Sequence, residues 1–225
     1  MSSPEREVVV PGDVLDGEGL KPGAGTFSEG GQIYAALLGI KRERGGYVNV
    51  VPLGGRYIPR AGDLIIGKVI DLGPSHWLID LNGPHPSPLH VNEVPWKVDF
   101  GDTARYLDVE DAVLVKIINV DETKRVNITM KDRSTRKLTG GRIVEISHAK
   151  VPRVIGRKGS MISLIKSFTN TRMFVGQNGW IWVDGDLDDV VHAVTAVEMI
   201  ESDAQVHGLT DAVRDFLEAT YGKAE

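Results

Sequence analysis

A loop of four residues, Gly156-Arg157-Lys158-Gly159, carries the residue types that can hold a phosphate backbone. Glycine at each end allows backbone conformations closed to other residues and lets a sugar-phosphate chain approach the main chain. The next segment has a helical pattern, and the first N–H groups and the dipole of a helix favour an anion. Arg157 and Lys158 add two mobile cations. The loop is therefore predicted to contact RNA or single-stranded DNA; the alternative is an ordinary turn.

The whole chain has a net charge of −5 and a pI near 5.7, which by itself argues against binding a polyanion. This average over 225 residues hides an uneven distribution of charge. Residues 124–183 hold thirteen Lys and Arg and two acids. Residues 184–225 hold two Lys and Arg and eleven acids, and residues 1–123 are also acidic. A segregated basic block is typical of nucleic-acid binders. The alternative is a solvated surface with no ligand.

The elements around the loop follow the order strand, helix, helix, strand, strand, helix. Strands are expected at "RIVEIS", "TRMFVG" and "GWIWVDG", and helices at "VPRVI" and "SMISLIKSF" on either side of the loop. A longer helix is expected over residues 186–205, because Val190, Val194 and Val197 share a face. This order with a Gly-x-x-Gly loop between the first two helices is typical of a type I KH domain, which clamps single-stranded nucleic acid.

One more helix follows, in "LTDAVRDFLEATYG". Thr210 is the predicted N-cap, and Gly222 is the predicted end of the helix.

Upstream, residues 61–133 contain about five short strand patterns and no strong helix, as in a five-stranded OB-type barrel. Such barrels bind single strands on aromatic platforms along a basic groove. Candidate ligand-binding residues are therefore the aromatic and cationic side chains of these strands, Lys68, His76, Trp77, His90 and Lys116. Two alternatives stay open: Trp77 alternates with Ile79 and Leu81 and so fits the core, and a lone histidine such as His90 is often structural.

Residues 1–60 hold 12 of the 26 glycines, between short apolar runs. This pattern predicts a small, twisted all-β unit. The run "IYAALLGI" has helical propensity, but Gly30-Gly31 and Gly45-Gly46 bracket a segment of hairpin length, which favours strands.

Enzyme signatures are absent from the sequence. There is no Cys, no Gly-x-Ser-x-Gly and no His-Glu-x-x-His, and "DGDLDD" lacks the spacing of a calcium loop. We expect no catalytic residue, no metal and no cofactor. No apolar run approaches the roughly 20 residues that span a bilayer, and the first residues have no secretory pattern, so a cytoplasmic location is expected and no membrane contact.

Three successive parts of the chain together resemble a known family. Residues 63–132 are similar to an S1 RNA-binding domain, with His90 on the histidine of that family but Ser87 and Pro88 in place of its Gly-Leu. Residues 140–205 are similar to a KH domain, and "GQNG" at 176–179 matches the Gly-x-Asn-Gly of one group of KH domains. A glycine-rich β unit followed by S1 and KH resembles the RNA-binding cap subunits of the archaeal exosome, homologues of ribosomal-RNA-processing protein four.

The resemblance implies an α+β multidomain protein with a ring-docking β domain (1–60), an S1 domain of OB fold (61–133), a KH domain (134–206) and a C-terminal helix (207–225). It implies three non-catalytic copies on a hexameric ring of RNase PH-type subunits, threading single-stranded, A-rich RNA toward 3′–5′ phosphorolysis. The alternatives are a freestanding S1–KH regulator and an accessory fragment of a polynucleotide phosphorylase-like nuclease; in such a nuclease the order is KH then S1.

Overall fold

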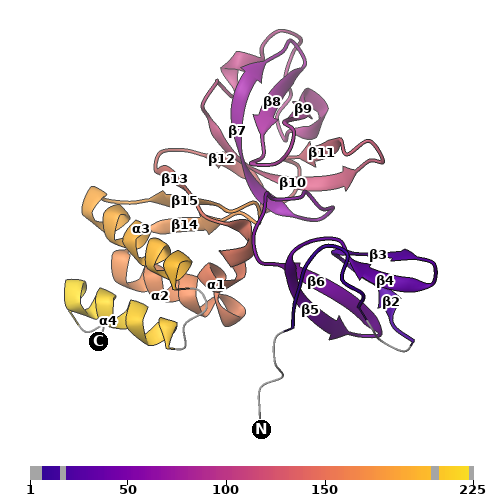
Figure 1. Cartoon of the computed structure of the whole chain (residues 1–225). Coiled ribbons are helices and arrows are strands. Elements are labelled where there is room, and N and C mark those ends of the chain that lie inside the picture. The colour runs from indigo at the N-terminus through magenta and orange to yellow at the C-terminus, as the bar shows by residue number, and fades with distance from the viewer. Residues whose placement is uncertain (1–6, 16–18, 204–207, 223–225) are drawn as a thin grey trace. The chain divides into compact units, whose positions relative to one another are not determined.

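The computed structural model describes residues 7–15, 19–203 and 208–222, and it divides into two units, residues 1–55 and 56–225. Figure 1 shows the chain with its elements labelled. Each unit is described by itself.

The first unit is built entirely of β-strands among its described residues. A sheet has the order β1-β5-β6-β2, and β3 and β4 form a separate hairpin. The strands are β1 (Val8–Val9), β2 (Lys21–Pro22), β3 (Thr26–Glu29), β4 (Gln32–Ala35), β5 (Gly39–Arg44) and β6 (Tyr47–Pro52). The all-β prediction is therefore confirmed here, and "IYAALLGI" is divided between β4 and β5 rather than helical.

Two glycine pairs make the hairpins of this unit. Gly30 and Gly31 join β3 to β4 with φ of 59° and 84°, and Gly45 and Gly46 join β5 to β6 with φ of 61° and 79°. Two successive positive φ values are what a two-residue hairpin turn requires, and glycine adopts them without steric cost. The turns place Val48 and Val50 in a small core with Val9, Leu15 and Ala35.

The second unit begins with the predicted barrel. Its five main strands are antiparallel in the order β11-β10-β7-β8-β9. They are β7 (Leu64–Leu72), β8 (His76–Asp80), β9 (Ser87–His90), β10 (Ala112–Val120) and β11 (Val126–Thr129), with 3₁₀ turns at η1 (Val91–Glu93) and η2 (Thr103–Arg105). The Ser87 hydroxyl donates to Val126 O, and Met130 N donates to Glu93 O at 2.7 Å, so the last strand is tied back to β9.

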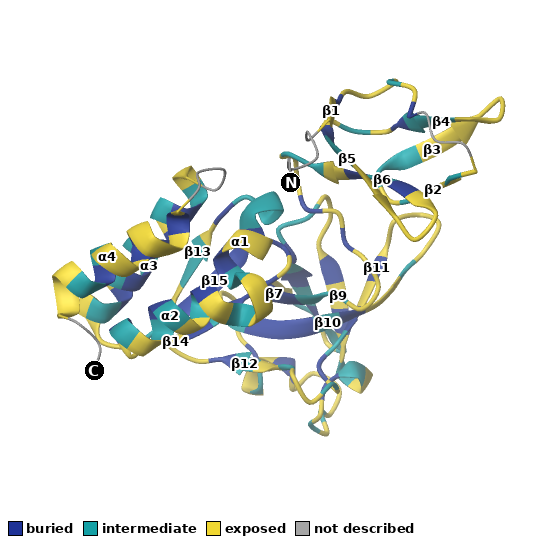
Figure 2. Cartoon of the chain, turned by 90° about the horizontal axis from the view of Figure 1, so that it is seen from below, coloured by how far each residue is buried: buried dark blue, intermediate teal, exposed yellow. Residues whose placement is uncertain are grey.

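The barrel has one more strand than the five predicted. β12 (Arg136–Leu138) pairs with β10, so this segment joins the sheet of the barrel, although the prediction assigned it to the KH domain. Figure 2 shows dark blue in the first part of β10, which has neighbouring strands on both edges.

The KH segment has the predicted β-α-α-β-β-α order. Its three strands form a sheet in the order β13-β15-β14, and its three helices are α1, α2 and α3. A further helix, α4, follows at the C-terminal end. The elements are β13 (Arg142–Glu145), η3 (His148–Lys150), α1 (Val151–Ile155), η4 (Arg157–Gly159), α2 (Ser160–Thr169), β14 (Arg172–Val175), β15 (Trp180–Asp184), α3 (Leu187–Ser202) and α4 (Leu209–Tyr221). Residues 204 and 205 of the predicted long helix lie outside the described residues.

This sheet is covered on both faces. Ile181 and Val183 of β15 pack into the core formed with the helices, whereas Trp180 and Trp182 pack against Ile66, Leu114 and Leu138 of the barrel. Successive side chains of a strand point to opposite faces, so "WIWV" carries no polar alternation because both faces are buried. Figure 1 shows the helices on one side of β13–β15 and the barrel on the other.

The last helix begins differently from the prediction. α4 starts at Leu209, with Gly208 as its N-cap at φ 82°, so Thr210 lies inside the first turn and does not cap it. The helix ends before Gly222, as predicted. Among the described residues, no helix combines the length and the apolar character needed to cross a membrane.

Candidate nucleic-acid interface

The two predicted histidines lie opposite each other on the barrel. His76 of β8 pairs with His90 of β9, and their neighbours Trp77 and Leu89 point into the core. Both histidines line a groove of about 660 Å³, which is completed by Pro88, Glu93, Ile118, Asn119, Asn127 and Ile128. We call this the histidine groove. It gathers side chains from four strands that are up to 52 residues apart in sequence.

The polar groups of the groove are partly fixed by bonds of their own. Asn92 N donates to His90 Nδ1 at 3.1 Å, so the proton of the neutral His90 ring lies on Nε2. Asn127 Nδ2 donates to Asn119 Oδ1 at 2.7 Å, which leaves the Asn127 carbonyl and the Asn119 amino group for a ligand. These donors and acceptors suit the edge of a nucleobase.

The groove is not basic. Among the eight residues that line it, Glu93 is the only one with a formal charge at neutral pH, and none is Lys or Arg. Phosphate neutralisation requires cations, whereas bases are bound by stacking and hydrogen bonding. Lys68 and Lys116, the two predicted cationic candidates, do not line this groove.

Each of these lysines has an acidic partner elsewhere on the barrel. Lys68 Nζ forms an ion pair with Glu110, beside the KH sheet. Lys116 Nζ lies 2.6 Å from Asp132 Oδ2. This bond, with help from Ser134 N, lowers the pKa of the Asp132 carboxyl to about 2. Both lysines remain partly exposed, so contact with RNA stays a prediction for them.

Trp77 belongs to the core. Its side chain has no exposed surface, and its Nε1–H donates to Thr103 O and Leu107 O, each at 3.2 Å. A ring in this place cannot stack on a base without unfolding the barrel. Trp77 is thus a structural residue, as the alternation with Ile79 and Leu81 indicated, and its assignment to the RNA site is wrong.

The Gly156–Gly159 loop lies between α1 and α2. Gly156 has φ 74°, and a Cβ there would lie 2.6 Å from Met161 N, so the chain requires glycine. Lys158 itself adopts the left-handed region at φ 55°. Arg157 and Lys158 are exposed, and neither side chain bonds to a described residue. Two cations are therefore displayed to solvent without a counter-ion from this part of the chain.

A further pair of cations lies near the second helix. The pKa of Lys166 is lowered, first by its burial and then by Arg136 of β12. A lysine that is pushed toward its neutral form by a neighbouring cation would gain from a bound anion. The basic block of the sequence is thus partly concentrated at α2.

The second glycine-bracketed turn, Gly176–Gly179, joins the KH sheet to the barrel. Asn178 is 1% exposed; its Nδ2 donates to Ile66 O at 2.7 Å and to Leu81 O at 2.9 Å, and its Oδ1 accepts from Ile66 N at 3.4 Å. Gln177 N donates to Leu64 O at 3.2 Å. This turn therefore bonds to the backbone of β7 and of Leu81, which directly follows β8, and the buried Asn178 is not available to a nucleic acid.

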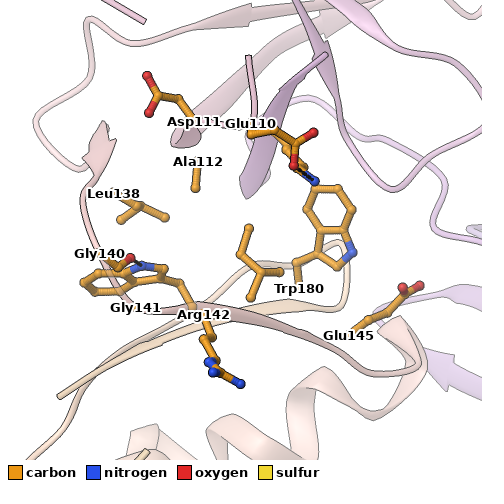
Figure 3. Close-up of a pocket in the computed structure, with 12 residues that line it drawn as sticks. Glu110, Asp111, Ala112, Leu138, Gly140, Gly141, Arg142, Glu145 and Trp180 are labelled. Carbon is orange, nitrogen blue, oxygen red and sulfur yellow. Dashed lines mark hydrogen bonds and ion pairs between the residues drawn. The ribbon is translucent and has the colours of Figure 1, made fainter. Parts of the chain in front are cut away.

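Beside this junction lies a second cavity, of about 570 Å³. Its walls come from β13, β15, β12 and the start of β10, with Trp180, Trp182 and Leu138 among the apolar side chains. Figure 3 shows the Trp180 ring reaching toward Glu110, whereas the Arg142 side chain points away from the cavity. Lys68 lies at this cavity rather than at the histidine groove.

Sequence reasoning did not single out Asn119, Asn127 or the buried role of Asn178. Asparagine is depleted in strands, so Asn119 and Asn127 near the ends of two strongly apolar runs were a usable signal. The partners of Asn178 are about a hundred residues away in the chain, and no local pattern reveals them. Within the described ranges, no group of three or more His, Cys, Asp and Glu is placed to hold a metal ion.

Comparison with known proteins adds two matched regions. Residues 8–42 match the family described as the N-terminal region of exosome complex exonuclease RRP4, and residues 141–199 match the KH domain family. A solved crystal structure, named as that of a candidate exosome complex RNA-binding protein, is similar with a TM-score of 0.67 and 34% identity, over 73% of this chain and 97% of the other.

Curated relatives are similar along nearly the whole chain. "Exosome complex component Rrp4" of Picrophilus torridus is 42% identical over 96% of this chain and 94% of its own length. The protein of the same name from Thermoplasma acidophilum is 40% identical over 98% and 93%, and that from Methanothermus fervidus is 42% identical over 95% and 96%. With this identity over nearly its full length, the chain belongs to the Rrp4 family of exosome complex components.

Proposed function

We propose that the chain is an RNA-binding subunit of the exosome, without catalytic activity of its own. Three copies cap a hexameric ring of RNase PH-type subunits, hold single-stranded, A-rich RNA and feed it to 3′–5′ phosphorolysis. The observation that carries this proposal is the histidine groove: a site without cations, lined by imidazole, amide and apolar groups, on an S1-like barrel of an Rrp4-family chain.

The groove and the loop supply two different kinds of contact. Bases enter the histidine groove, where His90 Nε2–H and the free groups of Asn119 and Asn127 meet their edges. The exposed Arg157 and Lys158 meet the phosphate backbone. Separation of base contacts from phosphate contacts suits a chain that holds RNA while the RNA moves, since phosphate contacts carry no sequence information.

Docking on the ring is assigned to the first unit. Its described surface shows large apolar side chains to solvent, including Val8 at 58%, Val10 at 50% and Leu38 at 49% exposure. Apolar side chains gathered on a small domain are typical of a protein interface. Burying them against a ring subunit would also support a unit whose own core is small.

One copy alone holds RNA weakly. If each chain neutralises about four phosphates, the single-strand salt slope is roughly −3, and affinity drops about fifty-fold between 50 and 200 mM salt. Three copies around one pore gain by effective concentration, because release from one leaves the RNA held by the others.

The test is reconstitution with the RNase PH-type subunits of the same organism. Native mass spectrometry is expected to give three copies of this chain per hexameric ring. Addition of the chain is expected to speed the phosphate-dependent degradation of A-tailed RNA relative to an untailed RNA of equal length. The chain without the ring is expected to leave RNA intact in the presence of phosphate.

Other outcomes point to the other functions. A monomer that binds RNA and has no affinity for the ring would make it a freestanding regulator. Phosphate-dependent loss of RNA with the chain alone would make it part of a nuclease. The Rrp4-type relatedness, which includes the N-terminal region, supports the ring-bound subunit over both.

A further inference from the structure

Phe100 is the most exposed large hydrophobic residue in the described part of the chain, at 83% of its full accessible surface. It lies in the loop between η1 and η2 of the barrel, and charged residues flank it, with Lys97, Asp99, Asp102 and Arg105 all exposed. A phenylalanine in this setting gives up the benefit of burial and leaves its ring open to solvent, where a planar ligand can stack on it.

The loop that carries Phe100 is held in place. Gly101 N donates to Pro74 O at 2.9 Å, and the Thr103 hydroxyl donates to Gly73 O at 2.8 Å. Beneath the loop, Trp96 and Tyr106 stack with ring centroids 5.7 Å apart. Before Phe100, Asp99 O accepts from Asp102 N at 3.1 Å, so the backbone is bonded on both sides of the ring. A ring on such a fixed base loses less entropy when a ligand binds.

The same turn connects Phe100 to the histidine groove. Gly73 and Pro74, which receive the bonds from the loop, lie in the turn between β7 and β8, and Ser75 separates them from His76. The His76 ring lies against Gly73, since a Cβ on that glycine would be 2.5 Å from the ring. Ser75 O also accepts from Val91 N at 3.0 Å, next to His90. Hydrogen bonds to residues 73–75 therefore link the backbone of the Phe100 loop to the segments that carry both histidines.

We propose that Phe100 forms a stacking subsite for an unpaired nucleobase next to the histidine groove. The proposal rests on the function proposed above and extends its RNA path by one base. Stacking on an aromatic ring tolerates every base, as a moving strand requires. A protein partner fits less well, because a single aromatic ring among four charged side chains is not the contiguous apolar patch that an interface needs.

The test measures binding of the full chain to two labelled oligomers at low salt by fluorescence anisotropy: oligoadenylate, and an abasic ribose-phosphate oligomer of equal length. Phe100→Ala and Phe100→Leu are each expected to weaken oligoadenylate binding roughly tenfold, and Phe100→Trp to stay within about twofold of wild type. Binding of the abasic oligomer is expected to be equal for all variants. Val109→Ala, which trims another exposed apolar side chain of the barrel at 44% exposure, is the matched control.

The subsite would be overturned if Phe100→Ala bound oligoadenylate as tightly as wild type does. It would also be overturned if Phe100→Leu did so, because an aromatic ring would then not be needed. An equal loss of affinity for the abasic oligomer would contradict it as well. Weaker binding of Phe100→Ala to the ring subunits, with RNA binding intact, would assign the residue to a protein interface and also refute the proposal. Failure of the proposed function is distinct, because wild type itself would then bind neither RNA nor the ring.

Discussion

The KH segment contains two turns with the same Gly-x-x-Gly spacing and opposite surroundings. In Gly156–Gly159 the middle residues are Arg157 and Lys158, which are exposed and unbonded within the described chain. In Gly176–Gly179 the second middle residue is Asn178, which is buried and bonded to backbone atoms of the barrel. The glycines fix only the shape of the turn, and the middle residues decide whether the turn meets a ligand or another part of the protein.

Exchange of the middle residues should break the buried turn. We expect Asn178→Lys to lower the free energy of unfolding by about 4 kcal/mol or more, because it buries an unpaired charge and leaves Ile66 N without its acceptor. Urea denaturation followed by tryptophan fluorescence measures the change. Gln177→Lys is the matched control, since Gln177 is exposed and should change stability by less than about 0.5 kcal/mol. Equal stability of both variants would contradict the role assigned to Asn178.

The last glycine of each turn gives a second matched pair. At Gly179, φ is 87° and a Cβ would lie 2.3 Å from Ile146 O, whereas at Gly159, φ is 81° and a Cβ would meet open space. We expect Gly179→Ala to cost about 3 kcal/mol and Gly159→Ala only the roughly 1 kcal/mol of left-handed strain. Thermal and urea unfolding of both variants would check the difference. Similar costs would show that the backbone of Ile146 and His148 does not crowd the second turn.

Removal of the exposed cations should affect RNA and leave the fold unchanged. For Arg157→Ala/Lys158→Ala we expect unfolding free energy within about 0.5 kcal/mol of wild type. If both cations contact phosphates, the slope of log affinity against log salt should become less negative by about 1.4. Anisotropy titrations with oligoadenylate between 50 and 200 mM salt would measure this. An unchanged slope would make the loop an ordinary turn.

Lys158 also carries a small conformational cost that asparagine would relieve. Its φ of 55° lies in the left-handed region, which asparagine tolerates better than lysine. Lys158→Asn should therefore raise the unfolding free energy by about 0.5 kcal/mol while weakening RNA binding at low salt. A stabilised variant with undiminished RNA affinity would separate the conformation of Lys158 from its charge, and would remove this lysine from the proposed RNA contact.

The smallest expected effect concerns the Lys116–Asp132 pair on the barrel. The pair lowers the pKa of Asp132 to about 2 from its ordinary 3.8, so its contribution to stability is present above pH 3.8 and is lost as the pH falls through about 2. Carboxyl carbon NMR titration should give this pKa in wild type and a higher pKa in Lys116→Met, still below 3.8 because the bond from Ser134 N remains. An ordinary Asp132 pKa in wild type would free Lys116 as a phosphate ligand like those of the first turn.

Local chemistry predicted most of the fold. Glycine pairs indicated the hairpins of the first unit, and alternating apolar residues indicated the barrel strands and left the core open as an alternative for Trp77. Local patterns failed at Arg136–Leu138, because its partner strand β10 is distant in the chain. They also misplaced the start of α4, where Gly208 rather than the nearby Thr210 is the N-cap. Distant partners also limited the prediction of the site. Residue type alone selected Lys68 and Lys116 as RNA ligands, but in the structure they form ion pairs with Glu110 and Asp132.

Trp180 and Trp182 join the barrel and the KH segment through a shared hydrophobic core. Both rings are nearly buried, and they sit in a core to which barrel and sheet contribute together. A gene fragment cut between residues 139 and 140 would expose these indoles on one product and Ile66, Leu114 and Leu138 on the other. The S1 and KH segments of this chain therefore cannot be exchanged independently, because recombination that replaces one must supply a surface that matches the other. Heat or denaturant should unfold the two segments together in one transition.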